Sequence, residues 1–524
     1  MGNYDKNRAV NALLDSCAEA YGPRDIFRWR TGEDVLAKSY AAFAGEARTL
    51  ACALAAATPP KARIAILGEN SYAWLLCWFA AVCAGRTAVP LDAALPTADA
   101  LALLQKSGAV LLFFGTGYND VAADFAAAAP QNRSVALADL PAFFAEIPAP
   151  ADWPCAPQPE DLAAIVFTSG TTGEPKGVPL SHWNLLSTAL SGCRCEDMAN
   201  HTMLAVLPFH HTISLTPGML AQLPGGSTVC IGGGIKRLPK DMEVFRPEYT
   251  MVVPLLAEGM YRKIWDTARK QGKEQLLRRM LRLSDGLRRV GIDLRRRLFR
   301  NVLAALGGEM IWMLCGGAAV SDDCVTGFSR LGVEILPAYG ISECGPGISV
   351  SSLAKHRLGS VGQVLDCCEV RVDAPDADGV GEILVRGDNV FGGYLEEEAA
   401  TQDAFTDGWF RTGDLGKRDR DGYLYITGRL KNLIILSNGK NVSPEPLEQR
   451  LLELDYVKEV LVYDDAGEIA AELYLDETDP GAAARLPTDL LAINRQLPAY
   501  ERITKTILRE TEFPKTTTKK IKRK

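Results

Sequence analysis

Apolar and polar positions along the first half of the chain follow a pattern typical of strands connected by helices. Residues 41–57 are Ala-rich and predict a helix, whereas residues 62–67 form a short apolar run that ends in a Gly turn. Residues 72–84 form a continuous apolar stretch that predicts a buried helix, and residues 109–114 form another short strand. This βαβα order predicts a mostly parallel sheet covered by helices.

The pattern changes from about residue 365 onward. Strand-like segments at 369–372 and 382–385 are separated by Gly and Asp turns, which predicts a smaller β-rich subdomain. Beyond Gly428 the chain predicts a compact α+β tail. Its expected elements are a strand at 433–436, a Ser-Asn-Gly turn at 437–439, a helix from about 444 to 448, and strands at 459–463 and 470–474.

Length and composition indicate a folded chain with several cores. At roughly 100–200 residues per domain, 524 residues predict three or four cores, and 47% hydrophobic with 23% charged residues is typical of soluble globular proteins. The net charge of −7 gives no general attraction to phosphate backbones, which disfavours nucleic acid as a partner.

The cysteines and apolar runs indicate the cellular compartment in which the protein folds. The 13 cysteines are odd in number and show no disulfide-like framework, so we expect reduced thiols in a cytoplasmic protein. We see no secretory signal, and the longest apolar run, residues 72–84, is shorter than the ~20 residues needed to span a bilayer.

One segment departs from the acidic average of the chain. Residues 262–300 carry 14 Lys or Arg against four Asp or Glu, a local charge of +10 (14 − 4). A solvated helical face is the simplest interpretation. A patch for the phosphates of CoA or for an anionic membrane, and hence peripheral membrane contact, is the alternative.

The run at 165–178, Ile-Val-Phe-Thr-Ser-Gly-Thr-Thr-Gly-Glu-Pro-Lys-Gly-Val, has the composition of a phosphate-binding loop. Small residues let backbone N–H groups approach an anion, hydroxyls add donors, and Lys176 adds a positive charge. The run is not a Walker motif, because Gly177 follows Lys176 where that motif has Ser or Thr.

With this loop the chain resembles the adenylate-forming superfamily over nearly its whole length. It is most similar to the long-chain fatty acyl-CoA synthetase branch, through Leu-Pro-Phe-His-His-Thr at 207–212 and the long basic insert before Cys-Gly-Gly-Ala-Ala-Val at 315–320. The resemblance implies an α/β fold: a large N-terminal AMP-binding domain, 1–430, of two doubly wound sheet subdomains plus the β-rich subdomain, and a small mobile α+β C-terminal lid domain, 431–524.

The resemblance assigns a nucleotide and metal site to three motifs. In Tyr-Gly-Ile-Ser-Glu at 339–343, the Tyr covers adenine, the Gly allows close backbone approach, Ser342 replaces the family's Thr at the α-phosphate, and Glu343 binds Mg²⁺. Thr168 is the second metal ligand. Besides Ser342, the residues that the resemblance places around the phosphates and the adenine are Ser169, Gly170, Thr171, Thr172, Gly173 and Lys176 in the loop, Gly317 and Ala318 in the adenine pocket, and Tyr339 and Gly340.

Further matches concern the ribose and the acyl group. In Asp-Gly-Trp-Phe-Arg-Thr-Gly-Asp at 407–414, Asp414 would accept hydrogen bonds from both ribose hydroxyls, and Arg429 would complete the ribose grip. His211 occupies the position where the family places an aromatic residue or His at the acyl site. His210 is not assigned a role.

Two lysines of the predicted C-terminal domain match residues with catalytic roles in the family. Lys431 matches the hinge residue, about which the C-terminal domain would rotate. The stretch Pro-Lys-Thr-Thr-Thr-Lys-Lys-Ile at 514–521 resembles the family's Pro-Lys-Thr-x-x-Gly-Lys-Ile, which makes Lys520 the catalytic lysine and puts Lys519 where Gly is usual. A solvated basic tail is the alternative interpretation.

The resemblance therefore implies an AMP-forming acid–thiol ligase. ATP and Mg²⁺ would activate a medium- or long-chain fatty acid to acyl-AMP, and the acyl group would pass to CoA. Two alternatives stay open: transfer to the phosphopantetheine thiol of an acyl carrier protein, and a non-catalytic nucleotide-binding homologue. The sequence does not fix the acyl chain length, the acceptor or the oligomeric state.

Overall fold

The computed structural model describes residues 8–169, 174–195, 199–436, 440–465, 467–515, 521 and 523. The chain divides into two compact units, Met1–Glu369 with Val385–Phe410 and Val370–Leu384 with Arg411–Lys524. Each unit has sheets and a buried core of its own. In the described part of the chain, no helix combines the length and the apolar content needed to cross a membrane.

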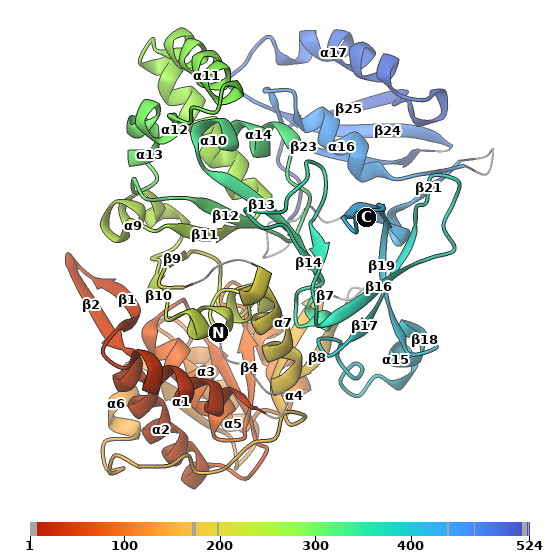
Figure 1. Cartoon of the computed structure of the whole chain (residues 1–524). Helices are drawn as coiled ribbons and strands as arrows, with labels where there is room; N and C mark the ends of the chain where they lie inside the picture. The colour runs from red at the N-terminus through yellow and green to blue at the C-terminus, as the bar shows by residue number, and fades with distance from the viewer. Residues whose placement is uncertain are drawn as a thin grey trace. The chain divides into compact units, whose positions relative to one another are not determined.

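The first sheet of unit 1 has six strands in the order β6-β5-β3-β4-β7-β8, with β7 and β8 antiparallel and the other neighbours parallel (Figure 1). Helices connect its parallel strands, which confirms the predicted α/β alternation. The strands are β3 Arg63–Leu67, β4 Thr87–Leu91, β5 Leu111–Phe114, β6 Arg133–Ala136, β7 Leu162–Ser169 and β8 Pro175–Ser181, and the helices are α3 Tyr72–Cys83, α4 Thr97–Ser107, α5 Asn119–Ala128 and α6 Leu140–Phe143.

Local sequence explains where two of the predicted helices begin. α2 (Tyr40–Ala57) starts after Ser39, whose side chain accepts a hydrogen bond from the backbone N–H of Ala42. α3 starts after Ser71, which caps the N–H of Trp74 in the same way. From Trp74 to its end α3 is buried, as its continuous apolar run predicts.

The second sheet of unit 1 has nine strands in the order β15-β14-β13-β12-β11-β9-β10-β1-β2, and it is parallel from β13 to β1. Antiparallel strands close both edges. The strands are β1 Asp25–Thr31, β2 Asp34–Ser39, β9 Thr202–Ala205, β10 Thr228–Ile231, β11 Tyr249–Val252, β12 Trp312–Cys315, β13 Glu334–Tyr339, β14 Ser349–Val350 and β15 Gln363–Val364, and the helices around them include α1 Val10–Tyr21, α7 His182–Cys195, α8 Thr212–Leu215, α9 Leu238–Phe245 and α14 Asp322–Leu331.

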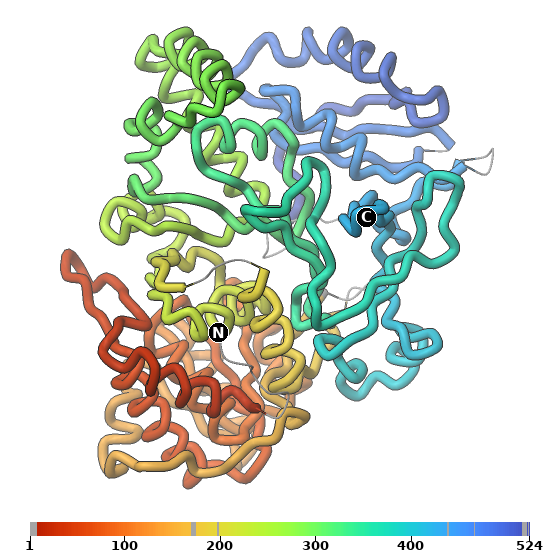
Figure 2. The backbone as a smooth tube through the Cα atoms, in the orientation of Figure 1, coloured from red at the N-terminus to blue at the C-terminus, as the bar shows by residue number. Residues whose placement is uncertain are grey.

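The basic segment lies between β11 and β12 and is helical, as predicted (green in Figure 2). Leu277 and Leu281 of its second helix pack on Phe299 and Leu331, which attaches the segment to the rest of unit 1. Its helices are α10 Pro254–Lys270, α11 Glu274–Arg289, α12 Arg295–Leu298 and α13 Arg300–Ala304.

The division between the units falls within three strands, β16 (Cys368–Asp373), β17 (Gly381–Gly387) and β19 (Trp409–Arg418). The first two confirm the strands expected at 369–372 and 382–385. α15 (Glu398–Ala404) and β18 (Phe405–Thr406) precede β19 in unit 1.

Unit 2 contains an antiparallel pairing of β19 with β20 (Leu424–Arg429) and a three-stranded sheet, β23-β24-β25. Its core includes Leu447, Leu451 and Val462. The strands and the helix expected in the tail are present, whereas the turn expected at 437–439 lies outside the described residues. The elements are β21 Ile434–Ile435, β22 Asn441–Val442, α16 Pro444–Leu452, β23 Val457–Asp465, β24 Glu468–Leu475, α17 Ala482–Gln496 and β25 Lys505–Arg509.

Candidate functional site

The predicted phosphate loop connects two antiparallel strands. β7 and β8 pair in a register that sets Thr168 opposite Lys176. The lysine therefore lies on a strand, unlike the helix that follows a Walker loop. The side chain of Ser169 and the loop residues Gly170, Thr171, Thr172 and Gly173 lie outside the described part of the structure.

The segment that follows β17 fixes the base of this hairpin. The backbone N–H of Leu395 donates to the carbonyl of Gly177 over 2.9 Å. A Cβ on Gly177 would lie 3.0 Å from the Leu395 Cβ, so the absence of a side chain permits this close packing. Lys106 Nζ donates to the carbonyl of Pro175 over 2.8 Å and pairs with Glu397 at 2.9 Å, which anchors both segments.

Tyr394 connects two of the predicted site residues and was not itself predicted. Its hydroxyl donates to Glu343 Oε1 over 3.0 Å, and Lys176 Nζ lies 4.7 Å from the centre of its ring. Burial and the Glu343 carboxylate raise the pKa of Tyr394, so the hydroxyl keeps its proton as a donor. Lys176, Tyr394 and Glu343, which we call the loop triad, thus form one set of contacts.

The donors present fit a magnesium ion that is bound together with a nucleotide. Glu343 offers a carboxylate and Thr168 a hydroxyl, both hard oxygen ligands. Among the described residues no group of three or more His, Cys, Asp and Glu could hold a metal without other ligands. Mg²⁺ commonly uses one or two carboxylates together with the phosphates of a substrate, and this donor set matches that mode.

The carboxyl ends of parallel strands bring the other unit 1 motifs together. Cys315 at the end of β12 pairs with Pro337 in β13, so Gly317 and Ala318 follow one strand while Tyr339 ends its neighbour. Gly317 has a φ of +87°, which lets the chain turn sharply out of the sheet. Ligands in α/β proteins bind at this edge of the sheet.

Ser342 and the His-His segment are in direct contact. The Oγ atoms of Thr212 and Ser342 are 3.3 Å apart and form a hydrogen bond. Ile213 also lies against Gly316, where a Cβ would be 3.1 Å from its Cδ1. The motifs at 207–212, 315–320 and 339–343, far apart in sequence, are therefore brought together.

Gly340 has no room for a side chain, for a reason the sequence did not predict. A Cβ there would lie 1.6 Å from the carbonyl oxygen of Pro346, so the close approach is between two parts of the same chain. This packing fixes the turn that carries Ser342 and Glu343. The expected approach of the Gly340 backbone to a nucleotide stays a prediction.

The two adjacent histidines have different surroundings. His210 is mostly buried, and its Nε2 lies 3.6 Å from Asp92 Oδ2. Burial lowers the pKa of His210, an effect that the Asp92 carboxylate opposes. His211 is half-buried and precedes α8, and its ring centre is 4.0 Å from that of His210.

The sequence analysis also did not predict a role for Asn70, which follows the strand expected at 62–67. Its Nδ2 donates to the carbonyl of Leu207 over 2.8 Å, and its Oδ1 accepts from the N–H of Phe209 over 2.8 Å. Asn70 follows β3 and Asp92 follows β4, so the edge of the six-stranded sheet holds the segment that carries His211. A polar residue in the turn after a strand, three positions beyond Leu67, was the signal available in the sequence.

Unit 2 carries the residues predicted for the ribose. Asp414 in β19 lies directly opposite Arg429 in β20, and Arg429 Nε pairs with Asp414 Oδ1 at 2.8 Å. The Asp414 side chain is only 4% exposed, whereas that of Arg429 is 44% exposed. Arg429 therefore neutralises a buried carboxylate and orients it.

Lys431 follows this pair in a short 3₁₀ turn, Leu430–Asn432. Partial burial and the positive charge of Arg429 lower the pKa of Lys431. The neighbouring Asn432 donates to Glu445 Oε1 over 2.6 Å, which connects the turn to the start of α16.

The predicted catalytic Lys520, together with Lys519, lies outside the described residues, but positions on both sides are fixed. Ile521 pairs with Lys515 in an antiparallel bridge. Arg523 binds Glu448 at 2.5 Å and donates to the carbonyl of Val462 over 3.1 Å.

Two family models match the chain. The model described as AMP-binding enzyme matches residues 15–395, and the model described as AMP-binding enzyme C-terminal domain matches residues 431–524. Between them they contain every predicted site residue except Asp414 and Arg429.

Curated relatives include ligases. The chain is 32% identical over 434 residues to the long-chain-fatty-acid–CoA ligase FadD15 of Mycobacterium tuberculosis, covering 77% of this chain and 71% of that protein. It is 33% identical over 332 residues to long-chain-fatty-acid–CoA ligase 6 of Mus musculus, covering 60% of this chain. The match spans about half, 48%, of the length of the mouse protein.

Solved structures share the fold over nearly the whole chain. The anthranilate CoA ligase AuaEII in complex with anthranoyl-AMP has a TM-score of 0.83 at 17% identity, covering 99% of this chain and 96% of that one. A Mycobacterium tuberculosis fatty acyl CoA synthetase has a TM-score of 0.69 at 23% identity, covering 98% and 96%. These likenesses confirm the predicted α/β architecture with its N- and C-terminal parts.

Proposed function

Because the chain belongs to the AMP-binding enzyme family, we propose that it is a ligase that activates a fatty acid with ATP and transfers the acyl group to CoA. The observation that carries the proposal is the loop triad. It places the cation of Lys176 over the ring of Tyr394 and the carboxylate of Glu343 at the hydroxyl of the same residue, beside the phosphate-loop hairpin. A cation for phosphate and a carboxylate for a phosphate-bound metal are what ATP activation requires.

In the first half-reaction a carboxylate oxygen of the fatty acid attacks the α-phosphorus of ATP. The bond from that phosphorus to the pyrophosphate oxygen breaks, which yields acyl-AMP and pyrophosphate. Lys176 contributes positive charge to the departing phosphates, Ser342 donates to the α-phosphate, and Tyr394 holds the Glu343 carboxylate in position. Glu343 and Thr168 would hold Mg²⁺, which would neutralise phosphate charge.

The remaining ATP contacts follow from the strand ends and from unit 2. Tyr339 would cover one face of the adenine, while the exposed Gly317 and Ala318 leave space for it. Asp414, oriented by Arg429, would accept hydrogen bonds from the two ribose hydroxyls.

In the second half-reaction a thiol attacks the acyl carbonyl, the bond to the phosphate oxygen breaks, and AMP leaves. We assign Lys520 to the first step, where an ammonium stabilises charge on the α-phosphate, and Lys431 to the hinge about which the C-terminal domain, residues 431–524, rotates between the steps. His211, at the start of α8, is assigned to the acyl entrance.

The names of the relatives support a fatty acid as substrate, and CoA as the acceptor. An acyl carrier protein is the other acceptor with the same thiol, and the +10 charge of residues 262–300 suits an acidic protein as well as CoA phosphates. A cytoplasmic location completes the proposal, since the cysteine pattern shows no disulfide framework.

ATP–pyrophosphate exchange with a panel of carboxylic acids tests the proposal. We expect exchange with fatty acids of medium to long chain and no exchange with amino acids or benzoates. Exchange with the latter alone would disprove the fatty-acid assignment. ATP binding without exchange for any acid would identify a non-catalytic homologue. Comparing CoA with a carrier protein in the complete reaction then identifies the acceptor.

A further inference from the structure

The second helix of the basic segment, α11, has one buried and one exposed face. Leu277, Leu281 and Ser284 point into unit 1, and in Figures 1 and 2 the helix lies at the outer edge of the segment. The opposite face therefore has no structural role in the core, and its composition must be explained otherwise.

Leucine and valine side chains form a row on the exposed face. Leu276 is 54% exposed, Leu283 56% and Val290 71%. Leu276 and Leu283 are seven residues apart in α11, which sets them along one line of a helix of 3.6 residues per turn, and Val290 directly follows the last helical residue, Arg289. Ile292, 47% exposed, extends the row beyond the end of α11. A single exposed leucine is ordinary, but an aligned row indicates a contact surface.

Arginines run parallel to this apolar row. Arg279, Arg282 and Arg289 are exposed and, at three- and seven-residue spacings, occupy the adjacent line of the helix. Among the residues that the structure describes, no carboxylate forms an ion pair with any of the three. We call the two rows together the α11 face.

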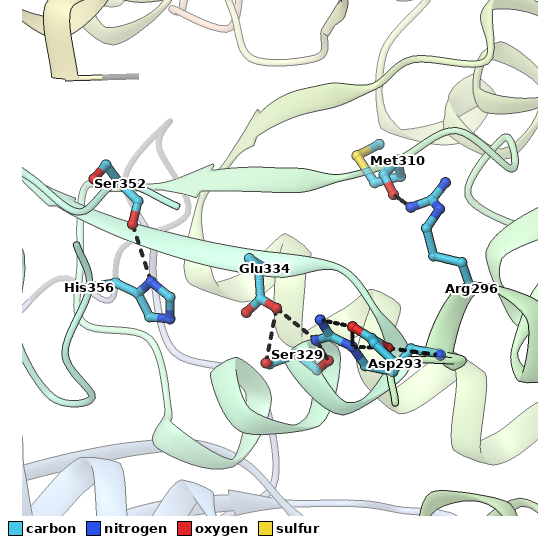
Figure 3. Close-up of polar contacts among 8 residues, drawn as sticks. Asp293, Arg296, Met310, Ser329, Glu334, Ser352 and His356 are labelled. Atoms are coloured by element: carbon cyan, nitrogen blue, oxygen red, sulfur yellow. Dashed lines mark hydrogen bonds and ion pairs between the residues drawn. The ribbon is translucent and has the colours of Figure 1, made fainter. Parts of the chain in front are cut away.

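Other arginines of the same segment are used structurally, which sets the α11 face apart. Arg295 pairs with Asp293 at 2.8 Å and Glu334 at 2.9 Å and donates to the carbonyl of Ser329. Arg296 donates to the carbonyl of Met310 over 2.7 Å, as Figure 3 shows. These arginines attach the segment to the sheet, so the arginines on α11 are not needed for that purpose.

We propose that the α11 face docks on an anionic lipid bilayer. Aligned apolar side chains beside unpaired arginines are the composition of a helix that lies in the plane of a membrane surface, with its apolar side chains among the lipids and its guanidinium groups on the phosphates. The +10 charge of the segment, in a chain of net charge −7, requires an anionic partner, and the exposed apolar row beside the arginines favours lipid over an acidic protein. The docking is independent of catalysis.

Sedimentation with vesicles tests the proposal on the full chain. The wild type should bind phosphatidylcholine vesicles that contain about one third phosphatidylglycerol, and should bind pure phosphatidylcholine at least ~10-fold more weakly. The variant R279E/R282E/R289E should lose ~100-fold or more in affinity for the anionic vesicles, at roughly fivefold per basic residue. The variant L276Q/L283Q should lose affinity that added salt does not restore.

Matched variants elsewhere on the surface control for nonspecific effects. R133E/R420E/R502E changes the net charge equally, and L358Q/L508Q removes leucines of similar exposure, 53% and 49%. Both should bind anionic vesicles within about twofold of the wild type. No binding of the wild type, or equal losses in the control variants, would overturn the proposal. So would capture of an acidic acyl carrier protein by the α11 face without any vesicle binding.

Discussion

The hydroxyl of Tyr394 donates a hydrogen bond to Glu343 Oε1 over 3.0 Å, although 51 residues separate the two in sequence. The same ring lies against Lys176 Nζ. A single tyrosine thus determines where the proposed metal-binding carboxylate lies relative to the proposed phosphate-binding cation.

Replacing Tyr394 with Phe removes the hydroxyl and keeps the ring, so it tests the contribution of the hydroxyl alone. We expect Tyr394→Phe to slow adenylation about tenfold and to raise the Mg²⁺ concentration needed for half-maximal exchange, because Glu343 loses its positioning donor. The matched control is Tyr456→Phe, which removes a tyrosine–carboxylate bond to Asp489 of 2.7 Å in unit 2. Equal effects of the two substitutions on exchange would assign Tyr394 to stability alone.

Asp414→Asn tests the ribose assignment. We expect a KM for ATP raised at least ~10-fold and a loss of discrimination against 2′-deoxy-ATP, since the buried carboxylate is proposed to accept hydrogen bonds from both ribose hydroxyls. Glu472→Gln, which breaks a cross-strand pair with Arg509 of 2.6 Å, controls for the loss of an ion pair in unit 2. If Asp414→Asn lowers the melting temperature but keeps the discrimination, Asp414 is structural.

The two adjacent lysines near the chain end differ in expected role. Lys520→Ala should slow adenylation at least ~100-fold, because one well-placed cation on a developing phosphate charge contributes about 3 kcal/mol or more. Lys519→Ala should cost less than ~10-fold. Thioester formation from supplied acyl-AMP should survive in Lys520→Ala. Reversed effects would shift the assignment by one residue.

Lys431→Pro fixes φ at the proposed hinge. We expect thioester formation to fall at least ~10-fold more than adenylation, measured by CoA consumption and by pyrophosphate exchange on the same preparation. Lys431→Ala, which removes the amine but leaves the backbone free, should retain both half-reactions more nearly equally. Parallel losses in the Pro variant would contradict a hinge at this residue.

His182 makes stability depend on pH. It is fully buried at the start of α7, its Nδ1 accepts from the N–H of Val10, and burial lowers its pKa to about 4 from 6.5. Between these values the unfolded chain binds the proton and the folded chain does not, so stability is lost as pH falls from 6.5 toward 4. The loss attributable to His182 is up to ~3 kcal/mol.

Denaturation curves at several pH values check this expectation. His182→Gln should flatten the pH dependence of the free energy of unfolding between pH 6.5 and 4, whatever it does to stability at neutral pH. His356→Gln, which replaces an exposed histidine, is the matched control for the loss of one imidazole. Parallel curves for the wild type and His182→Gln would disprove the assignment.

The sequence predicted elements where local patterns dominate. The helix expected at 41–57 is Tyr40–Ala57, and the strand expected at 62–67 is Arg63–Leu67, because apolar periodicity and Ser caps act over a few residues. Sheet order depends on contacts between distant segments, so the neighbours of β9 and β11 could not be inferred.

The same limit applies to the candidate site. Glu343 and Lys176 were predicted by their motifs, since family resemblance is local in sequence. Tyr394 and Asn70 were missed because their roles come from hydrogen bonds to segments 51 and more than 130 residues away. Gly340 shows a further limit, since the close approach of the Pro346 carbonyl oxygen to this residue arises only in the folded chain and could not be inferred from the sequence.

The two hydrogen bonds of Asn70 make one region of this protein dependent on an intact side-chain amide. Its amide uses the nitrogen toward Leu207 and the oxygen toward Phe209, so deamidation to aspartate would keep the acceptor and set a negative oxygen against a carbonyl. Asn70 is followed by Ser71, a small neighbour. Deamidation at this one position would therefore loosen the segment bearing His211.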